Sequence, residues 1–394
     1  MTIYSVFLRN VGIVIIDSML KITLPTPRVE NNNLGIVRLD DIGDFVTWLP
    51  AAKQLRSHFS KQKIILIANK SWASLANTIP FWDEVYSVDV SKLKRNFSYR
   101  RSIFKDVRNL KISTIIQPTY ICCLVTGDSI ARVANATVRI GSAGDSTSKR
   151  GLQKKIANQW YTRLITAIPG NLNVLERNIE FTFGLTGINS ENASFYIPEI
   201  QIEIGHLIPT KSYFLVFPAS NGSYKMWPRE RFASISRSLA RRTGYIPVIG
   251  GTRSEFELCK WISDQIEGSI NLAGKTNLLE AVELIRKAKF VLSNDSGSIH
   301  IAAATKTISF CILGGGHFGL FLPYPENSGG VLPQIIYYKM PCYGCGWRCH
   351  FETKNGAPFP CILNISEDSV LDFIEKELQK AGLTILGHQT NTFP

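Results

Sequence analysis

The first residues whose types and spacing could carry out acid–base chemistry are residues 38–44, Arg-Leu-Asp-Asp-Ile-Gly-Asp. They lie between an expected strand and an expected helix, and Gly43 allows a ligand to approach the backbone closely. Three carboxylates crowded at one strand end repel one another, so an ordinary surface loop has no need of them. Asp44 is therefore a candidate base for removing a proton from a hydroxyl group. The alternative is that Asp44 only stabilises the first turn of the helix.

A second group, residues 217–228, again lies between an expected strand and an expected helix. Ser220, Asn221 and Gly222 expose backbone N–H donors, and Lys225 adds a positive charge near the helix N-terminus. This composition suits a cradle for a diphosphate group. It is not a P-loop, because the pattern GxxxxGK[ST] is absent. The alternative is a polar loop with no ligand.

A third group, residues 293–300, has the sequence Ser-Asn-Asp-Ser-Gly-Ser-Ile-His before an alanine-rich helix. Asp295 and Ser296 could cap that helix, whose free N–H groups could face a phosphate. A carboxylate beside a phosphate would repel it, so we expect Asp295 to contact a sugar hydroxyl or to orient Lys225. His300 is either a ligand contact or a hydrogen-bonded core residue.

A fourth group, Gly314–His317, follows the last strong strand pattern of the chain. Three consecutive glycines allow the backbone to press against a ligand. A flexible loop without a ligand is the alternative.

Four of the eight cysteines lie in one short segment: Cys342, Cys345, Cys349 and Cys361. In a reducing compartment, thiols clustered in this way favour a structural zinc or iron site over disulfides. His350 is a possible substitute ligand. Free or redox-active thiols are the alternative.

The elements that position these groups alternate between strand and helix patterns, which predicts an α/β fold. Strands are expected at residues 34–39, 63–68, 85–88, 113–117 and 137–141, and again at 213–217, 246–250, 270–272, 290–293 and 307–313. We predict two Rossmann-like, doubly wound parallel-sheet domains facing a cleft. The domains are expected at residues 1–190 and 213–394, joined by a linker at 191–212, with a cysteine-rich insert at 340–362. The first four groups then lie at the carboxyl ends of strands, where such sheets bind ligands.

The composition narrows the choice of partners. The 394 residues favour two domains, and the net charge of +13 suits acidic partners. We expect no nucleic-acid partner, because no basic run carries interleaved aromatic residues. A phosphorylated sugar donor and an anionic membrane surface or lipid-linked acceptor fit better.

The N-terminal stretch Val6–Leu20 is apolar but is interrupted by Arg9, Asn10 and Asp17. It is too short and too polar to span a bilayer, and no small-residue cleavage site follows it. We expect a helix that lies on the protein or at a membrane interface. The chain is expected in the cytoplasm, with peripheral attachment to the inner face of the cell membrane as an option.

Taken in order, these groups resemble glycosyltransferase family 9, the ADP-heptose:lipopolysaccharide heptosyltransferases. The resemblance rests on residues 38–44 with Leu49–Ala51, on Lys225–Pro228, Gly250-Gly251 and Asn271–Thr276, and on Asn294–Gly297 with His300. The order and spacing agree over most of the chain.

The resemblance implies an inverting transferase of GT-B fold that needs no cofactor for catalysis. Such an enzyme moves a sugar, here heptose from ADP-heptose, to a lipopolysaccharide or another cell-surface glycan. By the same resemblance, Asp44 is the base and Lys225 steadies the departing diphosphate. Contacts to the donor are implied for Ser220, Asn221, Glu255, Thr276, Asp295, Ser296, Gly297 and His300, with Glu255 near the ribose and Thr276 near the adenine.

Three alternatives stay open. Many heptosyltransferases carry two threonines where this chain has Ser220 and Asn221, so a UDP- or GDP-linked donor for O-antigen or capsule is one of them. A nucleotide-sugar epimerase is the second, although no GxGxxG pattern follows the first strand. The third is an inactive, metal-stabilised scaffold protein, against which the presence of Asp44, Lys225 and Asp295 speaks.

Overall fold

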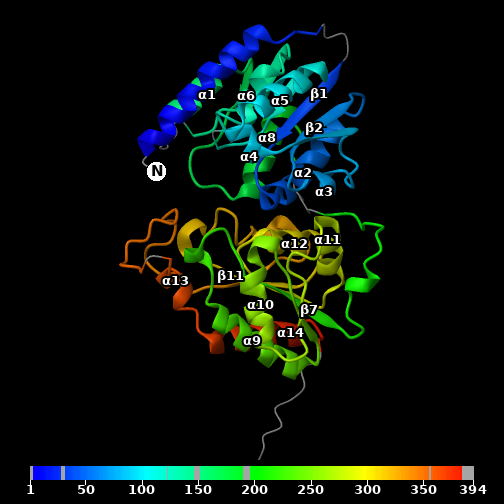
Figure 1. Cartoon of the computed structure of the whole chain (residues 1–394), viewed down its shortest axis with the longest axis vertical. Coiled ribbons are helices and arrows are strands. Elements are labelled where there is room, and N and C mark those ends of the chain that lie inside the picture. The colour runs from blue at the N-terminus through cyan, green and yellow to red at the C-terminus, as the bar shows by residue number, and fades with distance from the viewer. Residues whose placement is uncertain are drawn as a thin grey trace, which may run out of the picture. The chain divides into compact units, whose positions relative to one another are not determined.

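Two parallel sheets organise the chain, one in each of two units, Met1–Ala193 and Ser194–Pro394. The computed structural model describes residues 3–27, 32–121, 123–145, 151–189, 196–354 and 356–383, with side chains described from residue 10 onward. Figure 1 shows the two units in the colours of the chain. Each is described by itself below.

The sheet of the first unit has the strand order β3-β2-β1-β4-β5-β6, and all its neighbouring strands are parallel. Its strands are β1 (Asn33–Arg38), β2 (Ile64–Asn69), β3 (Glu84–Val88), β4 (Ile112–Gln117), β5 (Val138–Ser142) and β6 (Arg163–Ile165). The central strands β1 and β2 are apolar and buried along almost their whole length. Such continuous runs are typical of a parallel sheet that helices cover on both faces.

The helices of the first unit are α1 (Ile3–Thr23), α2 (Ile42–His58), α3 (Ala73–Ala76), α4 (Val90–Arg95), α5 (Phe97–Asn109), α6 (Gly127–Val133), α7 (Gly151–Asn158) and α8 (Val174–Thr186). Helix α1 lies along the outside of this unit and packs against α6 (Figure 1). The Asp17 carboxylate on α1 accepts hydrogen bonds from the Arg100 guanidinium at 2.5 Å and from the Ser129 hydroxyl at 2.7 Å. This buried ion pair, hydrogen-bonded on both sides, fixes α1 to α5 and α6.

The second sheet repeats the topology of the first. Its order is β12-β11-β10-β7-β8-β9, and its neighbouring strands are again parallel. The strands are β7 (Tyr213–Phe217), β8 (Ile246–Ile249), β9 (Ile270–Asn271), β10 (Val291–Asn294), β11 (Ser309–Ile312) and β12 (Gln334–Ile336). The helices are α9 (Arg229–Thr243), α10 (Phe256–Asp264), α11 (Leu278–Lys287), α12 (Gly297–Ala304), α13 (Pro360–Leu363) and α14 (Glu367–Lys380).

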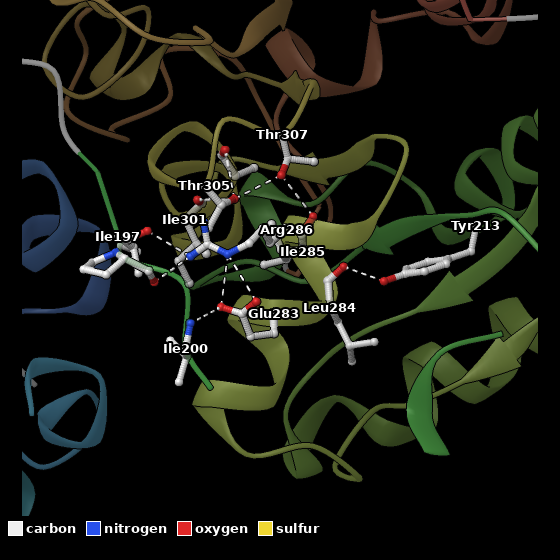
Figure 2. A network of polar contacts seen from close by, with 12 residues as sticks. Ile197, Ile200, Tyr213, Glu283, Leu284, Ile285, Arg286, Ile301, Thr305 and Thr307 are labelled. Atoms are coloured by element: carbon white, nitrogen blue, oxygen red, sulfur yellow. Dashed lines mark hydrogen bonds and ion pairs between the residues drawn. The ribbon is translucent and has the colours of Figure 1, made fainter. Parts of the chain in front are cut away.

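A buried polar network holds the entry segment of the second unit against α11 (Figure 2). The Arg286 guanidinium donates to the backbone carbonyls of Ile197 and Pro198 and pairs with the Glu283 carboxylate. That carboxylate also accepts from the Ile200 N–H at 3.0 Å. Glu283 is almost fully buried, and these partners satisfy its charge.

The prediction of two doubly wound α/β domains is confirmed by the two six-stranded parallel sheets. The expected linker is different in one respect. Residues 190–195 lie outside the described residues, whereas residues 196–200 belong to the second unit through the network above. Two three-residue edge strands, β6 and β12, were not predicted.

Candidate active site

Each sheet has one point where the chain reverses its direction of strand addition, between β1 and β4 in the first unit and between β7 and β10 in the second. Ligands of doubly wound sheets bind outside the carboxyl ends of the strands at this point. Residues 38–44 follow β1, and the second and third groups follow β7 and β10. The prediction that these groups lie at strand carboxyl ends is confirmed.

In the first unit, Arg38 organises the carboxylates at the end of β1. Its guanidinium pairs with the Asp40 carboxylate at 2.9 Å and donates to the Asp44 backbone carbonyl at 3.1 Å. It also lies over the Trp48 ring, 5.2 Å from the ring centroid. Arg38 is itself only 3% exposed, so its charge acts in a poorly hydrated environment.

The pKa of Asp44 is raised to about 7, first by burial and next by the neighbouring Asp40 charge, while Arg38 opposes the shift. Burial also raises the pKa of Asp40, against the effect of Arg38. Asp44 stands in the first turn of α2, where the helix dipole favours the charged form. A carboxylate whose pKa lies near neutrality is suited to accept a proton from a hydroxyl group at physiological pH.

The backbone around these carboxylates is held by the end of β2. The Asp40 carbonyl accepts hydrogen bonds from the Trp72 indole at 2.9 Å and from the Asn69 amide at 3.1 Å. Phe45 stacks on Trp72, with ring centroids 4.1 Å apart. The three-carboxylate loop is therefore a rigid feature of the unit, which the pre-organisation of a base requires.

A second buried polar group in this unit was not predicted. The Asp128 carboxylate accepts from the Tyr161 hydroxyl at 2.5 Å and from the Cys123 N–H at 2.8 Å. Burial raises the pKa of Asp128, and the buried Lys154 opposes the shift. No sequence motif predicts this group, because its members come from two separate segments, residues 123–128 and 154–161.

In the second unit, the loops after β7 and β10 are bonded directly to each other. The Ser220 hydroxyl donates to the Asp295 carbonyl at 2.8 Å, and the Asn294 amide donates to the Pro218 carbonyl at 2.5 Å. The Asn294 side chain also accepts from the Trp227 N–H. The second and third groups of the sequence thus form one site, in which Asn221 is exposed.

Lys225, Asp295 and His317 lie close enough to influence one another electrostatically. Burial lowers the pKa of His317 and the Lys225 charge lowers it further, whereas Asp295 opposes both effects. His317 ends the glycine-rich loop 314–317, which follows β11. The fourth group therefore joins the same site and brings a neutral imidazole beside the Lys225 ammonium.

Helix α12 begins differently from the prediction. Ser296 occupies its N-cap position, but its side chain makes no capping hydrogen bond. Its hydroxyl instead lies 2.8 Å from that of Ser298 and 3.1 Å from that of Ser293. Because the Ser296 side chain makes no capping bond, the expectation that Ser296 caps this helix is wrong, and the first N–H groups, at Gly297 and Ser298, lack a cap from that position.

His300 lies in the core, behind this helix start. Its Nδ1 is hydrogen-bonded to the Tyr324 hydroxyl, and burial lowers the pKa of the imidazole against the opposing effect of Asp295. The geometry matches the core alternative given above for His300. Its donor contact stays a prediction.

Glu255 and Thr276 lie on the loops after β8 and β9, which the Gly274 N–H joins by donating to the Gly251 carbonyl at 2.9 Å. Glu255 accepts from the Thr252 N–H at 2.7 Å in a capping box. Thr276 immediately precedes Asn277, the N-cap of α11. Both residues therefore lie at the same carboxyl edge as Ser220 and Asp295, each beside a helix or 3-10 turn start.

The four clustered cysteines lie near one another, since Cys342, Cys345 and Cys349 each raise the pKa of the buried Cys361 thiol, after the larger effect of burial. The Cys361 sulfur also accepts from the Gly315 N–H at 3.5 Å. Within the described ranges, however, no three His, Cys, Asp or Glu side chains are grouped so as to hold a metal ion.

Helix α1 is 21 residues long, but it is not apolar enough to cross a bilayer, and neither is any other helix in the described part of the chain.

The two units have the architecture of GT-B glycosyltransferases, with the polar groups at the switch point of each sheet. Residues 129–345, more than half of the chain, match the family described as glycosyltransferase family 9 (heptosyltransferase). The chain belongs to this family.

Two curated relatives are heptosyltransferases. The chain is 24% identical over 291 residues to lipooligosaccharide heptosyltransferase 2 of Haemophilus ducreyi, a match that covers 67% of this chain and 77% of that protein. It is 38% identical over 90 residues to lipooligosaccharide heptosyltransferase 2 of Haemophilus influenzae. This match covers 22% of this chain and 26% of that protein.

Solved structures share the fold. A family 9 glycosyltransferase from Veillonella parvula matches with a TM-score of 0.69 at 18% identity, covering 90% of this chain and 99% of that one. The E. coli ADP-heptose heptosyltransferase II matches with a TM-score of 0.64 at 17% identity. This match covers 89% of this chain and 99% of that one. The iron-containing dodecameric heptosyltransferase TibC of E. coli matches with a TM-score of 0.55 at 15% identity. This match covers 90% of this chain and 79% of that one.

Proposed function

We propose that this chain is an inverting glycosyltransferase that moves heptose from ADP-heptose to a hydroxyl group of a lipopolysaccharide or another cell-surface glycan. The match of residues 129–345 to the heptosyltransferase family carries the proposal, and the buried Asp44 at the start of α2, whose pKa is raised to about 7, supplies a base. A base of this strength suits deprotonation of a sugar hydroxyl. Family membership favours this activity over a nucleotide-sugar epimerase.

The second unit supplies the features that a departing diphosphate needs. Lys225 provides a positive charge, and the uncapped start of α12 provides free N–H groups. Together they would neutralise the charge that develops as the bond to the anomeric carbon breaks. Asp44 would take the acceptor proton as the acceptor oxygen attacks from the opposite face, which inverts the configuration.

Residues of the second unit are assigned here to the parts of the nucleotide-sugar donor that they would bind. Ser220, Asp295 and Gly297 would bind the diphosphate and the sugar, whereas Glu255 and Thr276 would bind the ribose and the adenine. Both oxygens of the Glu255 carboxylate can accept, and Oε2 is the one that accepts from the Thr252 N–H in the capping box. The other oxygen would be available to a ribose hydroxyl.

Calorimetric titration with ADP, UDP and GDP, followed by a transfer assay with ADP-heptose, tests this function. We expect ADP to bind more tightly than UDP and GDP, and heptose to appear on a heptose-deficient lipopolysaccharide acceptor. Preference for UDP or GDP would leave the fold and chemistry in place but contradict the donor. Binding of none of the three nucleotides would contradict the donor site and favour the scaffold alternative.

We also propose that the chain works at the inner face of the cell membrane, through the outward face of α1. This face carries Ile15, Met19 and Ile22, spaced one helical turn apart and all exposed. A groove of about 540 Å³ beside the end of α1 is lined by Leu24 with Phe97, Arg101 and Lys105 of α5. Apolar residues bordered by basic ones are the combination that binds anionic lipid surfaces.

Co-sedimentation with vesicles tests this surface. Vesicles that contain phosphatidylglycerol should retain the protein, and Ile15→Glu with Met19→Glu should release it without changing ADP affinity. Equal binding to neutral and anionic vesicles, or no loss in the double variant, would contradict the proposal.

We further propose that Cys342, Cys345, Cys349 and Cys361 bind a structural zinc or iron ion. Four thiols suit either metal, and the iron content of TibC gives a precedent within the same fold. The thiols are neighbours but do not converge, so metal binding would draw the segment together. Elemental analysis should find one metal ion per chain, lost in Cys345→Ser. An equal metal content in both proteins would contradict this.

A further inference from the structure

The segment 342–361, called the cysteine segment here, is bonded along the loop that carries His317. The Gly344 N–H donates to the Gly315 carbonyl at 2.8 Å, and the Gly346 N–H donates to the Gly316 carbonyl at 2.9 Å. From its other end, the Phe359 N–H donates to the Tyr224 carbonyl, next to Lys225. The cysteine segment therefore covers two loops of the proposed donor site at once.

Trp347 is the residue of this segment that contacts the functional side chains. The Lys225 ammonium lies over its ring, 4.8 Å from the ring centroid, and the His317 ring meets it edge-on at 5.9 Å. Tyr224 packs beside it at 5.6 Å. A cation over an indole face is attracted by the quadrupole of the ring, and the attraction grows where water is excluded.

The backbone of Trp347 is strained to make this contact. Its φ is +61°, a left-handed conformation that a bulky aromatic residue rarely adopts. The ring is seated on the backbone of Gly314 and Gly316, where an added Cβ would overlap the indole, at 2.7 Å from Cη2 for Gly314. Such strain persists only where the surroundings enforce it, and it concentrates at functional positions.

The indole N–H of Trp347 is a further polar feature of this side chain. Nε1 is buried and has no hydrogen-bond partner among the described protein atoms. An indole nitrogen can only donate, so the described protein atoms leave this buried group without an acceptor. This N–H belongs to the same indole that contacts Lys225, the residue proposed to bind the diphosphate.

From these contacts we propose that Trp347 is a positioning residue of the donor site, which holds the Lys225 ammonium in place for the diphosphate of the nucleotide. The inference rests on the proposed function, because it assigns the diphosphate to Lys225. The cysteine segment is then part of the donor site, whether or not its thiols also bind a metal. The ring supplies the positioning through its contact with the Lys225 ammonium.

Titration of ADP and AMP into variants of the full chain tests this role. We expect Trp347→Leu to weaken ADP binding about tenfold and AMP binding by less than about threefold, because AMP lacks the second phosphate. Trp347→Phe keeps a ring over Lys225 and should stay within about threefold of the wild type. Trp261→Leu is the matched control, since Trp261 makes a similar contact with Arg229 at 4.2 Å, remote from the glycine-rich loop in sequence.

A double-mutant cycle separates positioning from mere loss of structure. In a Lys225→Ala background, Trp347→Leu should weaken ADP binding no further, because the group on which it acts is gone. An additive loss, an equal loss of ADP and AMP affinity, or wild-type ADP affinity in Trp347→Leu would overturn the inference. If Lys225→Ala itself leaves ADP affinity unchanged, the proposed function fails instead, so the two failures are distinguishable.

Discussion

The two sheets share one topology, but the groups at their switch points have opposite chemical character. In the first unit, the loop after β1 concentrates Asp40, Asp41 and Asp44 around the buried Arg38. In the second unit, the loops after β7 and β10 carry hydroxyl and amide groups beside Lys225, before a helix start that no side chain caps. The shared sheet defines where a ligand binds, and the loop composition decides whether the site takes up a proton or neutralises an anion.

The largest expected effect comes from removing the carboxylate of the first unit. Asp44→Asn should lower turnover by roughly two or more orders of magnitude, because the amide cannot accept the acceptor proton. Initial rates with ADP-heptose and acceptor measure this. Asp41→Asn is the matched control, since Asp41 is exposed and its side chain makes no capping bond. Near-normal turnover in Asp44→Asn would remove Asp44 from the role of base.

In the second unit, Lys225→Ala should lower turnover by roughly two orders of magnitude and weaken ADP binding about tenfold, because the diphosphate loses its positive partner. Calorimetry with ADP measures the second effect. Lys260→Ala serves as control, since Lys260 is exposed and pairs with Asp264 within its own helix. If the control variant loses as much affinity as Lys225→Ala, the effect is one of net charge and not of the site.

The pH dependence sharpens the comparison further. Because the base must be deprotonated, kcat/KM should rise as the pH rises through about 7, the pKa of Asp44. Asp40→Asn removes a like charge and leaves Arg38 to act on Asp44. The rising limb of the kcat/KM profile against pH should therefore move to lower pH by about one unit. A limb that stays in place, or that moves to higher pH, would contradict the electrostatic account of the loop.

The smallest effect is on stability. The folded-state pKa of Asp44 lies above its ordinary value of 3.8, so the folded protein favours the protonated form. The free energy of unfolding should therefore fall as the pH rises from about 4 to about 7. Asp44→Asn removes this penalty and should stabilise the protein by roughly 1 to 3 kcal/mol at pH 8 but not at pH 4. Urea unfolding at both pH values would show this, and equal stabilisation at both would exclude a titration effect.

Most of the sheet framework could be predicted from the sequence, because ten strands carry strong apolar runs next to helix patterns. The strand Tyr213–Phe217 was predicted with its bounds, and nine other strands were predicted to within about two residues at each end. The edge strands β6 and β12 were missed.

The site was predicted less completely, since sequence motifs report residues that are close along the chain. Asp44, Lys225 and Asp295 were singled out in this way, each in a segment that follows a strand, and their roles stay predictions. The Asp128 group and Trp347 were not, because their partners come from distant segments. The spacing of the cysteines drew attention to thiols, whereas the contact with Lys225 is made by the tryptophan between them.

The most direct test of the division between the two sites is the ADP dissociation constant of Asp44→Asn measured beside that of Lys225→Ala. The account predicts that Asp44→Asn, although inactive, binds ADP as tightly as the wild type, while Lys225→Ala binds it about tenfold more weakly. An Asp44→Asn protein that loses ADP affinity as strongly as Lys225→Ala would contradict the assignment of the base to one unit and the diphosphate to the other.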